Sequence, residues 1–245
     1  MKQKKPIKIG TLNLQLGVCT TKGYSQYLTT FLKYALPHSV ESVDKGAADL
    51  AKGLDILTLT EAEAGSKRAK GKNQVRDIAG LADLTEAVFP LYNHGIIGQC
   101  NGMCSRYPFS VRENYELAGG IQRRSLGVAD VEVDDQNIVV ITAHLPLGKG
   151  SRKKPLSEIV KVVNEIEYPV ILTGDLNTED KEELKPVTEG TRLRPTDDYK
   201  TYPAWNPRLK LDHIFVSPEF EVDDVYVPFV KVSDHLPLVA EVCLR

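Results

Sequence analysis

The order of apolar and polar positions along the chain predicts a mixture of strands and helices. Period-two alternation and short continuous apolar runs indicate strands, at residues 7–14, 54–59, 169–174, 211–217 and 236–243, with several more between 95 and 145. The clearest pair is SLGVADVEV and IVVITAHL, which flank the polar turn DDQN and predict a hairpin.

Helical periodicity predicts three helices, over residues 39–52, 74–88 and 156–166. The third places one apolar face on Leu156, Ile159, Val160, Val163 and Ile166. The stretch from the end of the 169–174 strand to about residue 209 is polar, and we predict no element in it. Hairpins beside helical crossovers favour two packed sheets with helices outside over a doubly wound parallel sheet.

Length and composition are those of an ordinary globular protein, with 245 residues, 42% hydrophobic and 26% charged. The sequence shows no internal repeat or linker, so we expect a single domain over residues 1–245. No apolar run approaches the length of about 18 residues that a membrane span requires. The basic opening MKQKKP leads into a strand and not into a signal-peptide core, so we expect a cytoplasmic protein. We also expect a monomer.

Charge and cysteine content exclude two classes of protein. The formal net charge is −2, so a globally basic nucleic-acid binder is not indicated, and any anion must be bound by a local patch. Cys100 and Cys104 lack the spacing of a zinc knuckle, and neither Cys19 nor Cys243 completes a second pair. We expect reduced, structural thiols.

Acid, amide and imidazole side chains stand at the ends of the predicted apolar strands. Any one of them is commonly a turn former or a helix cap. Such groups destabilise a fold unless they are paired, hydrated or bound to a metal, so their recurrence predicts a shared site. The residues are Asn13, Glu61, His144, Asp175, Asn177, Asp212, His213, Asp234 and His235.

In their order along the chain these motifs carry a family resemblance. TLNLQ, LTLTEAEA, NGMCSRYPFS, ITAHLPLG, TGDLN, LDHIFVS and SDHLPL together resemble the endonuclease/exonuclease/phosphatase superfamily, which has the DNase I-like fold. The resemblance runs from about residue 7 to residue 243. It implies a four-layered α/β sandwich, in which two mostly antiparallel sheets pack face to face between outer helices.

The resemblance also implies a chemistry, the hydrolysis of phosphoesters with Mg²⁺, for which Mn²⁺ can substitute. Hard cations prefer oxygen ligands, and the matching positions are Asn13, Glu61 and Asp234. Many members have glutamine before the glutamate, where this chain has Thr60, and Glu63 is an alternative ligand two residues beyond Glu61.

By resemblance, the remaining motif residues act on water and phosphate. Asp175 orients and deprotonates the attacking water, and Asn177 holds the phosphate or fixes Asp175. His235 donates to a phosphate oxygen, and Asp234 orients that imidazole. His144 lies near the phosphate or the leaving oxygen, and Asp212 holds His144 or a second metal. No serine or cysteine nucleophile is needed, which predicts direct attack by water.

The remaining histidines are expected to be structural. His38 and His94 match no motif. His213 follows Asp212 on a strand, so its side chain should point to the opposite face.

Two basic segments predict a polyanionic substrate, with nucleic acid as the first candidate. GSKRAKGKN (65–73) follows the Glu61 strand and GKGSRKK (148–154) follows the His144 strand, so two loops should flank the site. Asn101, Arg124 and Trp205 are the candidate substrate contacts, with Trp205 and Tyr202 able to stack on a base or pack in the core.

The sequence leaves two other substrate readings open. A histidine at position 144 resembles DNase-type, sphingomyelinase-type and tyrosyl-DNA phosphodiesterase-type members more than abasic-site endonucleases. The alternative substrate is a small or lipid phosphoester, although no apolar docking loop is evident in the sequence. A non-catalytic scaffold would predict loss of Glu61, Asp175 or His235, and all three are present.

Overall fold

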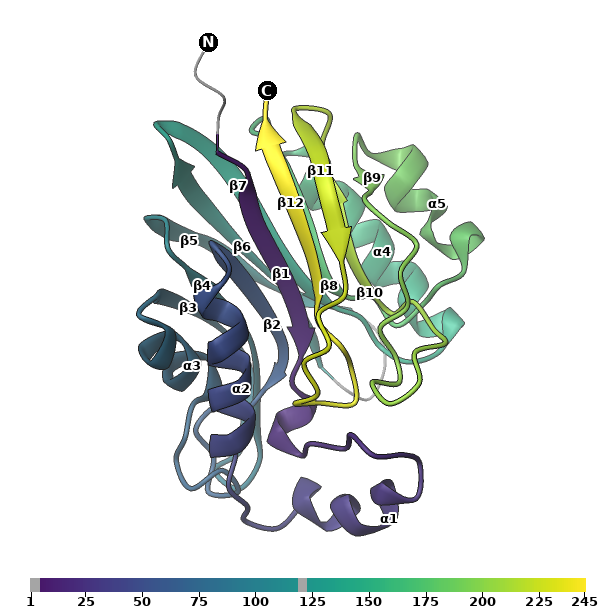
Figure 1. The fold of residues 1–245 in the computed structure, drawn as a ribbon. Helices are drawn as coiled ribbons and strands as arrows, with labels where there is room; N and C mark the ends of the chain where they lie inside the picture. The colour runs from purple at the N-terminus through teal and green to yellow at the C-terminus, as the bar shows by residue number, and fades with distance from the viewer. Residues whose placement is uncertain (1–4, 119–122) are drawn as a thin grey trace.

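Two six-stranded sheets pack against each other in a computed structural model that describes residues 5–118 and 123–245 (Figure 1). The first sheet has the strand order β11-β12-β1-β2-β4-β3, and the second has the order β5-β6-β7-β8-β10-β9. This confirms the predicted pair of sheets, each of which is mixed with mostly antiparallel pairs.

Strand bounds lie close to the predicted apolar runs, except that β3, β9 and β11 form where no strand is predicted. In the first sheet they are β1 Ile7–Asn13, β2 Ile56–Ala62, β3 Thr85–Asn93, β4 Gly98–Ser105, β11 Phe220–Tyr226 and β12 Leu238–Leu244. In the second they are β5 Phe109–Leu117, β6 Arg124–Val133, β7 Gln136–His144, β8 Val170–Asp175, β9 Arg194–Pro195 and β10 Asp212–Val216.

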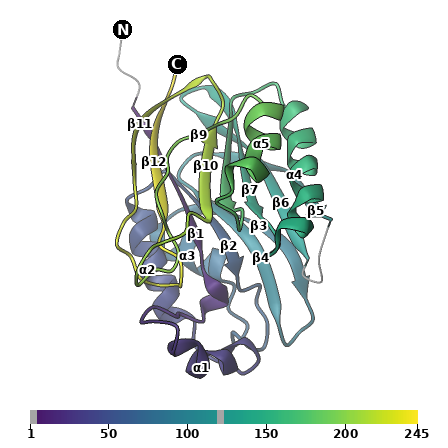
Figure 2. The ribbon, with the colours of Figure 1, turned by 90° about the vertical axis from the view of Figure 1, so that its right-hand side faces the viewer.

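Helices cover the outer face of each sheet and make the outer two of four layers. In Figure 2, α2 and α3 lie on one side of the paired sheets and α4 and α5 on the other. Their bounds, with those of α1 and two 3₁₀ turns, are α1 Gln26–Thr30, α2 Glu41–Lys52, α3 Gln74–Ala82, α4 Lys149–Asn164, α5 Lys181–Gly190, η1 Gln15–Gly17 and η2 Phe31–Tyr34.

Three apolar clusters hold the layers together. The middle one lies between the sheets and includes Ile9, Phe89 and Val140. One outer cluster joins α2 and α3 to the first sheet, and the other joins α4 and α5 to the second. A hydrogen bond of 2.8 Å between the hydroxyls of Thr58 and Thr173 also crosses the buried space between the sheets.

Two predicted elements differ from the observed ones. The helix predicted over 74–88 ends at Ala82, because Asp83 takes a left-handed conformation with φ 55°. The chain then turns into β3, which places Ala87 and Phe89 in the core between the sheets. The predicted basic loop 148–154 is mostly the first turns of α4.

The polar region without a predicted element also contains structure. It holds α5 and the short edge strand β9, whose apolar side chains are few. No helix in the described residues is long and apolar enough to cross a membrane, as the sequence predicts.

Candidate active site

A cleft of about 700 Å³ opens where β1, β2, β7 and β8 end. Parallel pairing of β1 with β2 and of β7 with β8 brings these carboxyl ends to one edge of the two packed sheets. Six of the nine strand-end residues line the cleft, namely Asn13, Glu61, Asp175, Asn177, Asp234 and His235, whereas His144, Asp212 and His213 do not. Other lining residues include Gln15, Tyr34, Arg68, Tyr92, Gln99, Arg124, Leu147, Arg152, Tyr202 and Leu209.

Asp175 is the central carboxylate, at the last position of β8. Strand register places it beside His144 on parallel β7 and beside Asp212 on antiparallel β10. Gly174 precedes it with φ 131°, and a Cβ there would lie 2.0 Å from the Ala143 carbonyl oxygen. Only glycine therefore lets β8 approach β7 closely enough to align these side chains.

Hydrogen bonds fix the orientation of the Asp175 carboxylate. The Asn13 amide Nδ2 donates to its Oδ2 at 3.0 Å, and the Asn177 backbone N–H donates to its Oδ1 at 2.9 Å. Asn177 has φ 53°, and its side chain donates to the Leu145 carbonyl. Of the two predicted roles for Asn177, the structure therefore shows the contact that fixes Asp175.

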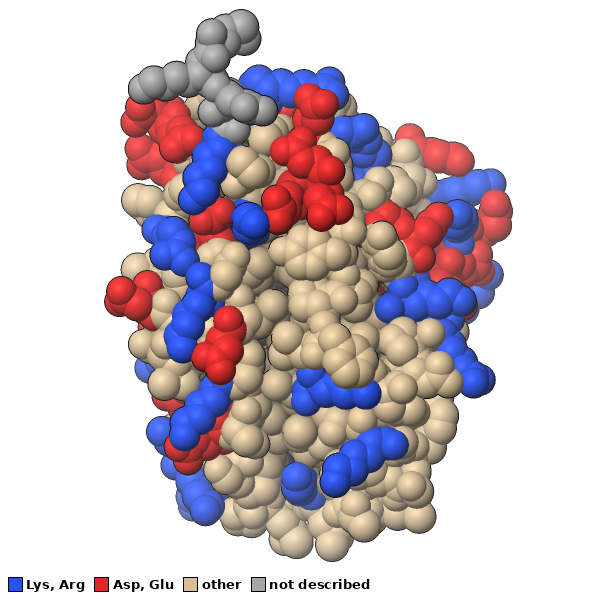
Figure 3. Space-filling view, in the orientation of Figure 1, with Lys and Arg blue, Asp and Glu red and all other residues tan. Residues whose placement is uncertain are grey.

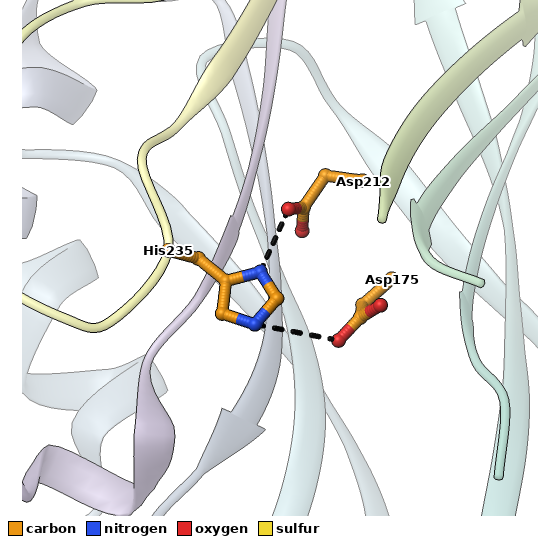
Figure 4. Close-up of side chains that lie close together, drawn as sticks. All are labelled: Asp175, Asp212 and His235. Atoms are coloured by element: carbon orange, nitrogen blue, oxygen red, sulfur yellow. Dashed lines mark hydrogen bonds and ion pairs between the residues drawn. The ribbon is translucent and has the colours of Figure 1, made fainter. Parts of the chain in front are cut away.

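His235 lies between two carboxylates (Figure 4). Its Nδ1 is 2.7 Å from Asp212 Oδ2, and its Nε2 is 3.9 Å from Asp175 Oδ2. Thr201 holds Asp212 from the other side at 2.5 Å. The prediction that Asp234 orients this imidazole is wrong, and so is the prediction that Asp212 holds His144: Asp212 is the partner of His235.

The surroundings of His235 and Asp175 favour a histidine cation beside a weakly acidic carboxyl group. Burial alone lowers the pKa of His235, but Asp212 and Asp175 outweigh it and raise that pKa to about 10. Burial raises the pKa of Asp175 to about 7, against the opposing positive charge of His235. An aspartate with a pKa near neutrality suits proton transfer at physiological pH.

His144 is fully buried and stays neutral. Burial and the nearby Arg124 lower its pKa well below the usual value. Its Nε2 lies 3.5 Å from Glu61 Oε1 and 3.7 Å from Asp175 Oδ2, and neither ring nitrogen has a hydrogen-bond partner among the described residues. Buried polar atoms normally have hydrogen-bond partners, so the two ring nitrogens stand out, although His144 is not among the residues that line the cleft.

Glu61 and Glu63 have different environments, which separates the two candidate ligands. Glu61 has a left-handed backbone (φ 50°) within a β-bulge of β2, and its side chain reaches the cleft with 23% exposure. Glu63 is fully buried and forms an ion pair with Arg68. The structure therefore makes Glu61 the carboxylate that is available to a ligand.

Asp234 also lines the cleft and is tied to α1. Its Oδ2 accepts from the Tyr27 hydroxyl at 2.6 Å, and its Oδ1 accepts from Ser233 at 3.1 Å. Burial is the main cause that raises the pKa of Glu61. The negative charge of Asp234 raises this pKa further, and the positive charge of Arg124 opposes both.

The donor set fits a hard divalent cation. Glu61, Asn13 and Asp234 all line the cleft and offer oxygen atoms. A second cluster, Asp175, Asp212 and His235, has ligand atoms within 4.8 Å of one another. In that cluster Asp212 and His235 already contact each other at 2.7 Å. In the first set Asn13 Oδ1 accepts from the Gln15 backbone N–H at 2.8 Å, and both oxygens of Asp234 accept hydrogen bonds.

Of the three predicted substrate contacts, Arg124 lines the cleft, and Asn101 and Trp205 do not. Arg124 begins β6, is buried and lines the cleft. Asn101 is buried on β4, donates to Ser125 and does not line the cleft. Trp205 packs edge-on against Tyr24 at 5.1 Å and also lies outside the cleft lining, whereas Tyr202 lines it and packs against His235 at 4.9 Å.

The two basic segments offer fewer accessible cations to a substrate than the sequence predicts. Arg68 and Arg152 line the cleft, but each is buried and paired with a carboxylate, Glu63 and Glu183 respectively. Lys149 is exposed and forms an ion pair with Asp180.

Sequence reasoning did not place two aromatic residues of the cleft, Tyr34 and Tyr92. Neither stands in a motif, and Tyr34 lies on the 3₁₀ turn η2, which the sequence did not predict. Of the histidines expected to be structural, His213 accordingly points away from the cleft, with its Nε2 2.8 Å from the Thr178 carbonyl. His38 and His94 do not line the cleft.

Comparisons with known proteins agree with this architecture. An endonuclease/exonuclease/phosphatase family protein from Bacteroides thetaiotaomicron superposes with a TM-score of 0.73 and 17% identity over 99% of both chains. A mannosyl-6-phosphatase from Bacteroides thetaiotaomicron VPI-5482 gives 0.72 and 15% over 97% of this chain and 100% of that one. The human Nocturnin catalytic domain with bound sulfate gives 0.69 and 17%, over 98% and 94%.

At these identities the structural matches show the fold alone. Comparison with curated protein sequences gave no significant match. The family model of the Endonuclease/Exonuclease/phosphatase family, by contrast, matches residues 10–235, a range that contains every motif residue from Asn13 to His235. The chain therefore belongs to the endonuclease/exonuclease/phosphatase family of phosphoester hydrolases.

Proposed function

We propose that this protein hydrolyses phosphoesters with a divalent cation, preferably Mg²⁺, by direct attack of water that Asp175 activates. The observation that carries the proposal is the position of Asp175, held by Asn13 and Asn177 at the cleft and next to His235. A base must lie within hydrogen-bond reach of the proton that it accepts, and Asp175 lines the cleft.

In the proposed reaction a water molecule bound to Asp175 forms the new bond to phosphorus. Its proton passes to the Asp175 carboxylate while the bond from phosphorus to the leaving oxygen breaks. His235, held as a cation by Asp212, donates from Nε2 to a phosphate oxygen and offsets the growing negative charge. Neutral His144 accepts or donates one hydrogen bond to the phosphate group or its water.

Glu61, Asn13 and Asp234 would hold the cation. When bound it would polarise a phosphoryl oxygen and offset negative charge in the transition state. Asn13 also donates to Asp175 at 3.0 Å, so the cation and the general base would act on the same phosphate group.

Two substrate classes have support from separate observations. Exposed Lys67, Lys70, Lys153 and Lys154 flank Arg68 and Arg152 of the cleft, which favours the phosphate backbone of a nucleic acid. Exposed apolar side chains beside the cleft favour a lipid phosphoester instead.

The first test compares wild type with Asp175→Asn on a panel in the presence of Mg²⁺. The panel comprises supercoiled plasmid, a labelled single strand, an abasic duplex, a 5′-phosphotyrosyl oligonucleotide, sphingomyelin and bis-p-nitrophenyl phosphate. We expect turnover to fall by about 10²–10⁴-fold in Asp175→Asn, the usual contribution of a general base. EDTA should abolish the wild-type activity.

The same panel contains the results that would refute the proposal. Equal turnover by wild type and Asp175→Asn would remove Asp175 from the chemistry. Activity that survives EDTA would remove the cation. The neutral amide is nearly isosteric with the buried carboxyl group, so a melting curve like that of wild type would show that lost activity is not lost folding.

A further inference from the structure

The segment over residues 24–36 presents its apolar side chains to solvent. It comprises α1 and the 3₁₀ turn η2, at the end of the molecule where β1 and β2 terminate (Figure 1). We call its exposed large side chains the apolar rim, and give the exposed fraction of each: Tyr24 64%, Leu28 83%, Phe31 70%, Leu32 59% and Leu36 53%.

The inner side of the same segment is polar and fully engaged in hydrogen bonds. Tyr27 donates to Asp234, Gln15 donates to the Tyr34 hydroxyl, and Thr30 bonds Thr20 at 3.0 Å. An amphipathic helix on a water-soluble surface normally buries its apolar side and exposes its polar side. This segment does the reverse, and its polar contacts hold the apolar rim outward.

The apolar rim adjoins the cleft. Tyr34 of the same segment lines the cleft, and Arg68 from the neighbouring loop donates to the Tyr34 carbonyl at 2.9 Å. Leu147 and Leu209, which are 69% and 38% exposed, line the cleft as well. An apolar surface therefore borders a site whose proposed substrate is a phosphoester.

The charged side chains within residues 14–40 have one sign, while the Asp234 carboxylate contacts Tyr27 on the inner side of the segment. Residues 14–40 contain no aspartate or glutamate and two lysines, Lys22 and Lys33. Exposed Lys67 and Lys70 stand in the loop that contacts the segment. In Figure 3 the lowest part of the face, where α1 lies, shows lysine or arginine among tan residues and no acidic side chain.

We propose that the apolar rim docks onto a phospholipid surface and that the cleft hydrolyses the headgroup phosphoester of a lipid held there. Apolar side chains enter the boundary between headgroups and acyl chains, and lysines at the same level attract anionic lipids. The sequence showed no docking loop, because the outward side of the segment is recognisable only once its inner contacts are known. The proposal rests on the proposed function and names its substrate class.

The test is co-flotation of the protein with vesicles of phosphatidylcholine alone and of phosphatidylcholine with phosphatidylserine. The variant is Leu28→Ser/Phe31→Ser/Leu32→Ser, and the matched control is Leu81→Ser/Val111→Ser, which removes exposed apolar side chains on α3 and β5. We expect the partition coefficient of the rim variant to fall by about tenfold or more, and that of the control to stay within about twofold of wild type.

Turnover measured on two substrates separates this inference from the proposed function. Both variants should hydrolyse bis-p-nitrophenyl phosphate like wild type, while the rim variant alone loses turnover of vesicle phospholipid. Vesicle binding without turnover of any phosphoester would refute the proposed function and the lipid-hydrolysis part, and leave the docking surface.

Three other results would overturn the docking surface. One is absence of wild-type binding to both kinds of vesicle. Another is concentration-dependent self-association that the rim variant abolishes, since the rim would then be covered by a second copy. The third is binding of single-stranded DNA that the rim variant abolishes while vesicle binding is unchanged.

Discussion

At the scale of single residues, two glutamates two positions apart have opposite surroundings. Glu61 lies in a bulge with its carboxylate at the cleft, and Glu63 is buried against Arg68. The sequence ranks them only by resemblance. The structure separates them, because one carboxylate is satisfied by an ion pair and the other is open to a ligand.

Mg²⁺ should stabilise wild type against heat, and Glu61→Gln should lose most of that gain. A ligand that binds only the native state adds RT ln(1 + [L]/Kd), about 2.7 kcal/mol at a concentration 100 times Kd. Differential scanning fluorimetry with and without Mg²⁺ measures the shift.

Glu63→Gln is the matched control for that measurement. It should unfold at a lower temperature without metal, because removing one partner of a buried ion pair costs about 3–5 kcal/mol. Its Mg²⁺ shift should equal that of wild type. A lost shift in Glu63→Gln and a retained one in Glu61→Gln would reverse the assignment.

Asp44 makes stability depend on pH. It is buried on α2 and accepts from Gln74 at 2.7 Å. Burial raises its pKa to about 7, with Asp77 acting in the same direction and Gln74 and Lys72 opposing it. The folded carboxyl group therefore keeps its proton up to about pH 7, whereas in the unfolded chain it loses it near pH 4.

Because the folded state binds more protons between about pH 4 and pH 7, the free energy of unfolding should fall as pH rises through that window. Asp44→Asn keeps an acceptor for Gln74 and removes the ionisation. The melting temperature of Asp44→Asn minus that of wild type should increase as the pH is raised from about 5 to about 8. A constant difference across the window would contradict the raised pKa.

At the scale of elements, the alignment of β7, β8 and β10 places three polar side chains in one row. His144, Asp175 and Asp212 are register neighbours, and the close approach of β7 and β8 depends on Gly174. Each strand supplies one residue, and none of the three would meet the others without this pairing.

Gly174→Ala should destabilise the protein by about 2 kcal/mol or more, because its Cβ would overlap the Ala143 carbonyl and its φ is unfavourable for alanine. Gly150→Ala is the control, since its Cβ meets nothing within 4 Å. Chemical denaturation measures both. A Gly174→Ala variant as stable as wild type would show that β8 can move away from β7 at little cost.

At the scale of the whole molecule, the two sheets share one apolar core. Phe89 on β3 fills the space above Gly127 on β6, where an added Cβ would lie 2.3 Å from the ring. The site takes side chains from both sheets, so its geometry depends on this packing.

Phe89→Ala should lower the free energy of unfolding by about 3–5 kcal/mol, the usual cost of removing a buried aromatic ring. If residues 1–245 form one domain, as the sequence predicts, both sheets should still unfold in a single transition. Phe229→Ala, at a 75% exposed position, should change stability by less than about 0.5 kcal/mol. Two transitions in calorimetry of wild type would indicate that the sheets unfold separately.

By itself the sequence determined the elements whose signal is local. Periodicity located most strands and the helix before β8, and the ordered polar residues at strand ends identified the family and predicted the residues of the candidate site. It fails where the local signal is weak: the predicted helix 74–88 runs into the first four residues of β3, and neither β11 nor the largely polar α5 is predicted.

The tertiary structure decided which side chains meet. Asp212 and not Asp234 orients His235, because strand register and a loop conformation set that contact. Arg68 and Arg152 look like substrate-binding cations in sequence, but each is buried and already forms an ion pair, with Glu63 and Glu183 respectively. The apolar rim could not be predicted from the sequence for the same reason. Which side of the segment faces solvent depends on the residues that bind its inner side, and these residues come from other parts of the chain.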